Sequence, residues 1–471
     1  MSSCRIALVP FGLVLALTGC ATRSPESRIG ELSSGVPKSW SATKEARAGV
    51  DRDWVRSFGD AGLVALVKEA VLNNPDLRVS SERVRRAEAI ARLSGVGRKP
   101  QLTGQVTGLL QQRRFPGFPI RLDSNTAEVY GASLEVNWEM DLWGRLRASE
   151  GAAIAEQQAQ LRDHQAARAS LSGQLAKLWF MLGETGEQIS LARAALEVRE
   201  KTVMSIRERF GAALEGGLAS QLRLAETDLA SSRAVLARWE GERARVVRQI
   251  ELLAGRYPDG SLMNQNGLPR LPKAPPAGLP SELLLRRPDI LAAERRYAAA
   301  GENLKVTKLA RYPSFSLTGG AGTTTSALEK ILDSRFGIWS LAGGVVQPLV
   351  SGGRLSQEER IAGHDEEVAL RELQAAVLRA FGEVEQALVA EKFFARREES
   401  VAESARSARE AAEAAIKDFA DGAVDALVLL AAQDRQIQTA FQLVSLRRMR
   451  LENRINLHLA LGGDFKLRAE R

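Results

Sequence analysis

The chain has 471 residues, with 65 lysines and arginines against 57 aspartates and glutamates, and a formal net charge of +8. Hydrophobic residues make up 45% of it and charged residues 26%, proportions typical of a folded chain and not of a disordered one. The longest apolar run, Ile6 to Gly19, is shorter than the roughly 20 residues that a membrane-spanning helix needs. The sequence therefore predicts no helical membrane protein.

The first twenty residues have the pattern of a bacterial secretory signal. Arg5 precedes an apolar stretch, and Leu17-Thr18-Gly19 stands directly before Cys20. Small residues before a cysteine resemble the bacterial lipobox, in which that cysteine is acylated and becomes the first residue of the mature protein. We therefore predict a lipoprotein signal peptide over residues 1–19 and lipidation at Cys20. An ordinary signal peptide with an incidental cysteine is the alternative.

The segment after Cys20 has the composition of a connection to the membrane. Residues 20–52 are polar and small and show no apolar periodicity, so we expect a lipid-anchored tether there. Ala21 follows the cysteine, whereas an aspartate at that place favours retention in the bacterial inner membrane. The sequence thus favours a protein anchored in the outer membrane and extending into the periplasm.

The rest of the chain carries the same landmarks twice, in the same order. Asn74-Pro75-Asp76-Leu77 recurs as Arg287-Pro288-Asp289-Ile290, and Gly144-Arg145-Leu146 recurs as Gly353-Arg354-Leu355. Such repetition predicts two tandem copies of one structural unit. Six prolines between the two copies mark an extended connection. The expected organisation is repeat 1 over 53–256, a proline-rich linker over 257–280, repeat 2 over 281–463 and a C-terminal tail over 464–471.

Each repeat contains two segments in which apolar and polar residues alternate, as in a β-strand with two different faces. In the first repeat Leu134, Val136 and Trp138 alternate with polar residues, and Tyr130 extends their face. We predict that these four residues face lipid; a sheet in water is the alternative. Short helices precede the strands, which are expected over about 101–113, 127–139, 314–324 and 335–348.

Long helical segments follow each pair of strands. No proline occurs over 142–213 or 354–420, and roughly seventy residues of helix extend about 105 Å. Apolar residues recur at heptad spacing in the segments that return, which indicates coiled-coil packing. We therefore expect long helical hairpins over about 142–254 and 354–461. A compact helical bundle is the alternative, and helices of this length disfavour it.

The number of strands bears on the oligomeric state. Four strands cannot close a barrel, and an open sheet edge in lipid leaves backbone groups unpaired. Membrane barrels have eight strands or more. At least two chains must therefore share one barrel, and three chains give twelve strands around an aqueous lumen.

Four blocks of sequence, spread over both repeats, carry the signature of a family. They are Trp54 with Phe58-Gly59-Asp60, Trp138-Glu139-Met140-Asp141-Leu142-Trp143-Gly144-Arg145, Gly278-Leu279-Pro280-Ser281-Glu282-Leu283-Leu284-Leu285-Arg286-Arg287-Pro288-Asp289-Ile290, and Pro348-Leu349-Val350-Ser351-Gly352-Gly353-Arg354. These blocks resemble the NodT-type outer-membrane factors, which are lipoprotein relatives of the TolC-like efflux channels. The resemblance covers residue 20 to about 463.

The resemblance implies an α+β membrane protein that forms a homotrimer. Three chains would build a 12-stranded outer-membrane β-barrel that continues into a periplasmic α-barrel of twelve helices. It also implies docking to a periplasmic adaptor protein and an inner-membrane pump. The expected function is a passive export duct for small molecules in a tripartite efflux or secretion system, embedded in outer-membrane lipid.

In such channels, charged residues at the turn of the second helical hairpin close the periplasmic tip. That turn covers residues 419–430 here, and the positions that usually hold aspartates are Val428 and Ala431. Turn and N-cap duty is the alternative role for the aspartates that lie nearby. The candidate gate residues are Asp421 and Asp425, as a displaced anionic ring, and Leu427 and Val428, as an apolar constriction.

Other chemistry finds little support in the sequence. His164, His364 and His458 are isolated in long helical segments, and no phosphate loop or nucleophile elbow occurs. Glu139 and Asp141 are paired carboxylates, which we expect to cap the helix that begins near residue 142. We therefore predict no catalytic site, no metal site, and no cofactor other than covalent lipid on Cys20.

Two functional classes remain after these exclusions. The arginines are spread along helices with few aromatic residues between them, so we expect no nucleic-acid partner. A periplasmic coiled-coil lipoprotein with a structural or tethering role is the alternative to the export duct. The amphipathic strands favour the duct, because a tether does not need them. The sequence leaves open the exported compound, the family of pump and adaptor, and the residues that contact the adaptor.

Overall fold

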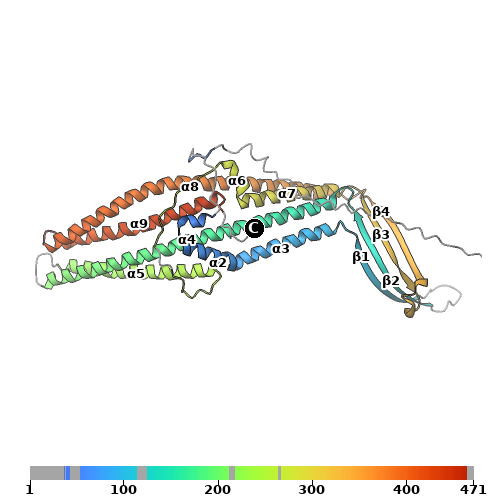
Figure 1. Cartoon of the computed structure of the whole chain (residues 1–471), viewed down its shortest axis with the longest axis horizontal. Helices are drawn as coiled ribbons and strands as arrows, with labels where there is room; N and C mark the ends of the chain where they lie inside the picture. The colour runs from blue at the N-terminus through green and yellow to red at the C-terminus, as the bar shows by residue number, and fades with distance from the viewer. Residues whose placement is uncertain are drawn as a thin grey trace, which may run out of the picture.

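The computed structural model describes residues 37, 39–42, 53–113, 125–211, 218–263 and 267–463. Within these residues the molecule is long and narrow. A four-stranded sheet lies at one end, and two long helical hairpins extend from it toward the other (Figure 1). The predicted signal peptide, the lipidation site Cys20 and the C-terminal tail lie outside the described part of the chain.

The two halves of the chain contain the same elements in the same order: a 22-residue helix, two strands, a 67-residue helix and a 35-residue helix. The first half consists of α3 (Pro75–Val96), β1 (Gln101–Arg113), β2 (Asn125–Met140), α4 (Arg145–Gly211) and α5 (Ala219–Leu253). The second half consists of α7 (Pro288–Leu309), β3 (Ser314–Thr325), β4 (Gly337–Val346), α8 (Arg354–Ala420) and α9 (Ala426–Ala460). Shorter elements are η2 (Trp54–Phe58), α2 (Ala61–Asn73), α6 (Pro280–Arg286), η3 (Leu328–Lys330) and η4 (Ser334–Phe336).

The helix α3 shows how the sequence sets a boundary. Pro75 occupies the first turn, where a missing N–H costs no hydrogen bond. The side chain of Asn74 accepts a hydrogen bond of 2.9 Å from the backbone N–H of Leu77, one of the donors that a helix start leaves unpaired. The helix α7 begins at the corresponding proline, Pro288.

The strand-to-helix turns also match between the halves. Gly144 has φ 85° and Gly353 has φ 87°, a left-handed conformation that glycine adopts at no steric cost. The long helix follows directly in both cases, at Arg145 and Arg354. The expected start near residue 142 was therefore three residues early, because the chain turns before it becomes helical.

The paired carboxylates at this turn have separate roles. The side chain of Asp141 accepts hydrogen bonds from the backbone N–H groups of Leu146, at 3.0 Å, and Arg147, at 2.8 Å. This confirms the capping role predicted for Asp141. The same prediction was wrong for Glu139, whose side chain forms an ion pair with Arg145 at 2.7 Å.

The strands form one antiparallel sheet in the order β1-β2-β3-β4. The strand expected over 335–348 is shorter than the prediction. Residues 334–336 belong to η4, and the chain leaves the sheet after Val346. Pro348 cannot donate a ladder hydrogen bond, which fits its place outside β4.

The main hydrophobic core lies midway along the molecule, where η2 and α2 pack against the long helices (Figure 1). Its largest fully buried side chains include Trp54, Leu63, Leu175, Phe180 and Ile250. The core holds α4 against both α5 and α9, so the two hairpins are joined at their middle. In the described residues of the linker, 257–263 and 267–280, no helix precedes Pro280, which begins α6 at the last residue of the predicted linker.

Part of the predicted tether is fastened to this middle region. Trp40 is only 4% exposed, and its indole N–H donates to the carbonyls of Ala277, at 3.2 Å, and Gly278, at 3.0 Å. The backbone N–H groups of Ser41 and Ala42 each donate to the carboxylate of Glu385 in α8. Residues 40–42 of the predicted tether therefore lie against the linker and α8.

Candidate functional site: the sheet faces and the helical tip

The register of the sheet places apolar residues of all four strands on one face, because directly opposed residues in an antiparallel pair point to the same side. Leu134 lies opposite Gly104 and Ala321, and Val136 lies opposite Leu102 and Gly319. The large apolar residues of this face are Leu102, Val106, Leu110, Tyr130, Leu134, Val136, Trp138, Phe315, Leu317, Trp339, Leu341 and Val345, and Glu128 also lies on it, opposite Leu110. All four residues predicted to face lipid therefore share this face.

The opposite face is mainly polar and small. It comprises Thr103, Gln105, Ser133, Glu135, Asn137, Ser316, Thr318 and Ser340, with glycines between them and the apolar exceptions Leu109, Val129, Ile338 and Val346. The sheet therefore has one apolar side and one hydrophilic side. A strand with this alternation suits a boundary between lipid and water.

The apolar face is uncovered in the single chain. Leu102 is 65% exposed, Leu134 56% and Leu341 68%. Exposed apolar surface of this kind marks an interaction site for lipid or protein. In addition, β1 and β4 each pair on one side only, so the sheet has two open edges. An open edge must be satisfied by another strand before it can lie in lipid.

Aromatic side chains gather where the sheet meets the helices. The indole N–H of Trp138 donates to the carbonyl of Arg98 at 3.0 Å, and that of Trp143 donates to the carbonyl of Pro313 at 2.8 Å. The ring of Trp143 also lies 5.4 Å from that of Tyr312, centre to centre. Such rings, apolar at one end and hydrogen-bonded at the other, are typical of a membrane–water boundary.

The opposite end of the molecule holds the turn of the second hairpin (Figure 1). The side chain of Asp425 accepts a hydrogen bond of 3.0 Å from the backbone N–H of Val428, so it caps α9. Asp421 stands at the end of α8 and is exposed. Leu427 is 48% exposed and Val428 50%. The capping role that the sequence offered as the alternative for Asp425 is confirmed.

A contact between the hairpins that the sequence did not reveal lies at the same tip. Arg209, in the last turn of α4, donates hydrogen bonds to the carbonyls of Phe419, at 2.5 Å, and Ala420, at 3.1 Å. These carbonyls belong to the last turn of α8, and that of Phe419 also accepts the backbone N–H of Gly422 at 3.1 Å. The first hairpin thus caps a helix of the second. The turn of the first hairpin, residues 212–217, lies outside the described residues.

Polar contacts join the hairpins further along their length. Glu184 of α4 is almost completely buried and forms an ion pair with Arg448 of α9. The hydroxyl of Ser445 donates to the same carboxylate at 2.6 Å, and Gln188 donates to the carbonyl of Phe441 at 3.1 Å. Because buried polar groups are costly without partners, these contacts fix one register between α4 and α9.

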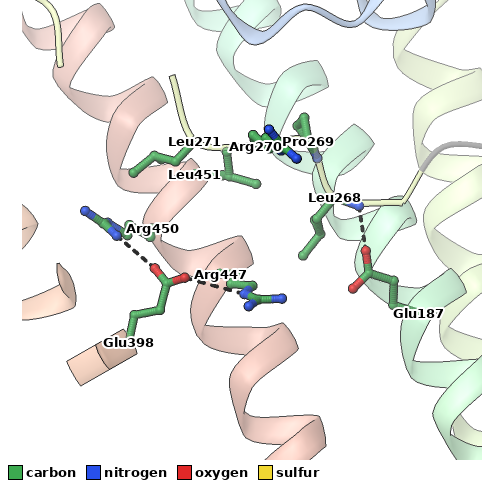
Figure 2. A pocket seen from close by; sticks show the side chains of 9 residues that line it. All are labelled: Glu187, Leu268, Pro269, Arg270, Leu271, Glu398, Arg447, Arg450 and Leu451. Carbon is green, nitrogen blue, oxygen red and sulfur yellow. Dashed lines mark hydrogen bonds and ion pairs between the residues drawn. The ribbon is translucent and has the colours of Figure 1, made fainter. Parts of the chain in front are cut away.

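A cavity of about 370 Å³ lies between α4, α8, α9 and the linker (Figure 2). Figure 2 shows three of its charged side chains joined: Arg450 donates to Glu398 at 2.9 Å, and Arg447 lies 3.4 Å from the same carboxylate. Glu187 accepts the backbone N–H of Leu268 at 2.7 Å. These contacts join α8 to α9 and the linker to α4.

The described residues provide no cluster for a metal ion and no apolar membrane-spanning helix. Among them, no group of three or more histidine, cysteine, aspartate or glutamate side chains is placed to hold a metal ion. No helix in the described ranges is both long enough and apolar enough to cross a membrane. The features that remain for a function are the two-faced sheet and the helical tip.

Comparison with known proteins agrees with this geometry. A family model described as "outer membrane efflux protein" matches residues 66–256 and 279–463, and so covers most of both halves. The cation efflux system protein CusC of Escherichia coli O6:H1 is 29% identical over 482 residues, which cover 99% of this chain and 100% of that protein. The pyoverdine export outer membrane protein OpmQ of Pseudomonas putida is 29% identical over 98% of both chains.

Solved structures show the same fold. The outer-membrane channel OprN superposes with a TM-score of 0.87 at 27% identity, over 94% of this chain and 99% of that one. The outer-membrane channel MtrE of Neisseria gonorrhoeae, in an open state, gives 0.80 at 26% identity, over 94% of this chain and 97% of that one.

Proposed function

Because the chain belongs to the outer membrane efflux protein family, it is an outer-membrane channel of an efflux system, and we propose that three copies close one continuous tube. The observation that carries this proposal is the two-faced sheet with two open edges. An apolar outer face suits lipid, a polar inner face suits a water-filled duct, and the edges demand neighbouring copies.

The strand directions support closure by identical chains. Successive strands in the sheet are antiparallel, so β4 runs opposite to β1. The free edge of β4 can therefore pair antiparallel with β1 of the next copy. Two copies would give eight strands, whose interior is just filled by side chains, whereas three copies give twelve strands and room for a lumen. The helices α4, α5, α8 and α9 of three copies would form the twelve-helix periplasmic barrel.

We further propose that the two halves arose as a tandem repeat of one unit. The equal lengths of α3 and α7, of α4 and α8, and of α5 and α9 support this origin. Two similar halves in each of three copies would give the tube six similar sectors.

The gate is proposed at the periplasmic tip. Asp421, Asp425, Leu427 and Val428 lie on the turn there, and all four are exposed in the single chain. Arg209 would hold the second hairpin in its inward position through its contacts with the end of α8. Opening would then require these contacts to break.

A passive duct has no energy source of its own, so export through it requires partner proteins. The proposed partners are an inner-membrane pump, which would supply the energy, and a periplasmic adaptor, which would join pump and tube. We propose lipidation at Cys20. Passive conduction requires neither a catalytic residue nor another cofactor.

The identity of the exported compound is not assigned, since relatives of equal identity are named for cation efflux and for pyoverdine export.

The test is assembly and conduction of the purified full-length protein. A closed trimer should run as a heat-modifiable species that resists SDS until boiled, and it should conduct ions in planar lipid bilayers. A monomer that never conducts would support the tethering role instead. The uncovered apolar face of the sheet argues against that role, because a periplasmic tether would expose it to water.

A further inference from the structure

Charged residues are rare in the sheet, and one of them occupies an unusual place. The four strands contain Arg113, Glu128, Glu135 and Glu139 as their only charged residues. Arg113 ends β1, and Glu128 lies opposite Leu110, on the apolar face. Glu139 forms an ion pair with Arg145 at the junction with the helices. Glu135 alone stands in the middle of the polar face.

The surroundings of Glu135 leave its carboxylate open. Its neighbours across the sheet are Thr103 and Gly320, and Ser340 follows in the same row. Gly320 has no side chain to cover it: a Cβ built there would lie 4.0 Å from the Cγ of Glu135. Glu135 is exposed, and no cationic side chain of the described residues forms an ion pair with it.

Other charges of the strands are distant along the sheet. The backbone of Arg113 pairs with that of Asn125, ten positions from Glu135 along β2, which corresponds to roughly 33 Å. Glu139, four positions away or roughly 13 Å, is already neutralised by Arg145. The charge of Glu135 therefore stands alone over the central part of the strands.

On the basis of the trimer proposed above, we propose that three Glu135 side chains form a carboxylate ring inside the barrel and make the duct prefer cationic over anionic solutes. Three-fold symmetry places the three copies at one level. Twelve strands about 4.8 Å apart, tilted by about 40°, enclose a barrel with a radius of about 12 Å. Side chains that reach inward bring the carboxylates to roughly 7 Å from the axis.

That distance makes the ring effective at physiological salt. The Debye length is about 8 Å at 0.15 M ionic strength, so an ion on the axis remains within reach of all three charges. Screened Coulomb attraction of this size enriches monovalent cations roughly threefold at the ring and depletes anions to a similar degree. Rings of acidic side chains confer the same preference on other cation channels. The preference should grow as salt is lowered.

The first experiment measures the reversal potential of the purified trimer in planar bilayers under a KCl gradient. The wild type should prefer K⁺ over Cl⁻ several-fold, Glu135→Gln should lose most of that preference, and Glu135→Lys should shift it toward Cl⁻. Glu128→Gln removes the same charge from the same strand on the apolar face and should leave the potential near the wild-type value. If Glu135→Gln conducts with an unchanged reversal potential, the ring does not set selectivity.

A second experiment tests the position of the side chain. The chain contains only Cys4, which lies in the predicted signal peptide, and Cys20, which carries the proposed lipid, so an introduced cysteine would be the one free thiol of the mature protein. A charged, membrane-impermeant thiol reagent should block current through Glu135→Cys and leave Leu134→Cys unaffected. If Glu135→Cys conducts and resists the reagent, the inference fails although the tube stands. If no variant or wild-type protein conducts, the proposed function itself fails.

Discussion

The guanidinium of Arg209, at the end of α4, lies 4.3 Å from the ring centre of Phe419, at the end of α8. Together with its hydrogen bonds to the carbonyls of Phe419 and Ala420, this cation–π contact joins the tips of two hairpins that are 210 residues apart in sequence. The side chain of Phe419 is buried, which shields the contact from water.

Replacing Arg209 with Gln should loosen the tip. Hydrogen bonds from a charged donor contribute about 1.5–3 kcal/mol each, so the inward position of the second hairpin should lose roughly a tenfold preference or more. Single-channel recording should show a higher conductance or open probability. Arg207→Gln is the matched control, because Arg207 pairs with Glu226 inside the first hairpin. Equal behaviour of the two variants would remove Arg209 from the gate.

Substitution of Asp425 should separate capping from gating. Asp425→Ala removes the N-cap of α9 and should cost about 1 kcal/mol, seen as faster amide exchange at the start of that helix. Asp425→Asn keeps a capping oxygen and removes the charge. A change of conductance in Asp425→Asn would assign the charge to the gate, whereas wild-type conductance with intact exchange protection would leave Asp425 a capping residue.

An arginine at Leu134 should hinder assembly, since this residue lies near the middle of β2 on the apolar face. A charge at the midplane of the bilayer costs about 2–4 kcal/mol on the lipid side of a barrel. The yield of the SDS-resistant trimer should therefore fall. Asn137→Arg, on the polar face of the same strand, should assemble far better. Equal yields would show that the faces are assigned wrongly.

Acid should weaken the ion pairs around Arg287. Burial acts to raise the pKa of Asp289, but the hydrogen bonds and charge of Arg287 outweigh it and hold that pKa below its ordinary value. A lowered pKa in the folded state adds stability above the unfolded pKa of about 3.9, and this stability is lost as the pH falls through the folded value.

Melting temperatures at several pH values test this expectation. Asp289→Asn should melt below the wild type at pH 7, and the difference should shrink as the pH falls below about 4. Asp76→Asn changes the corresponding position of α3, for which no ion pair is found among the described residues, and should have less effect. A difference for Asp289→Asn that stays constant at low pH would exclude the proposed linkage.

Replacing Cys20 with Ser should abolish acylation, which metabolic labelling with a fatty acid would measure. The unlabelled protein should also remain longer with its signal peptide attached, because the lipobox is processed at the modified cysteine. Labelling at the wild-type level in this variant would refute the lipidation proposed at Cys20. The two alternatives for the N-terminus, lipoprotein and ordinary secretion, are thereby distinguished.

Local periodicity made much of the fold predictable from sequence. Alternation of apolar and polar residues places Leu134, Val136 and Trp138 on one face, and the register of the sheet agrees. The absence of proline over 142–213 and 354–420 anticipated α4 and α8, apart from a few residues at their ends. Such patterns can be interpreted from sequence alone because each depends only on the apolar and polar sides of a single strand or helix.

Contacts between distant elements were not predictable in this way. Nothing in the helical pattern marks Arg209 as a cap for α8, because its partners are backbone carbonyls that any residue would supply. Trp40 did carry a signal, as a lone large aromatic residue in a polar segment, yet its binding place depends on how the linker lies against α8. The short β4 reflects a glycine-rich strand whose ends have no clear alternation.

The contact at Trp40 limits the distance between the channel and a lipid attached to Cys20. Twenty residues stretch to roughly 70 Å at most, while α8 covers roughly 47 Å of rise between its first residue, Arg354, and Glu385. The segment from Cys20 to Trp40 is thus long enough to reach the leaflet beside the sheet, and its maximum length exceeds the required distance by only roughly 20 Å. Acyl chains on Cys20 of each copy would therefore insert into the bilayer close to the barrel. If a dozen residues were removed from this segment, the acyl chains could no longer reach the bilayer.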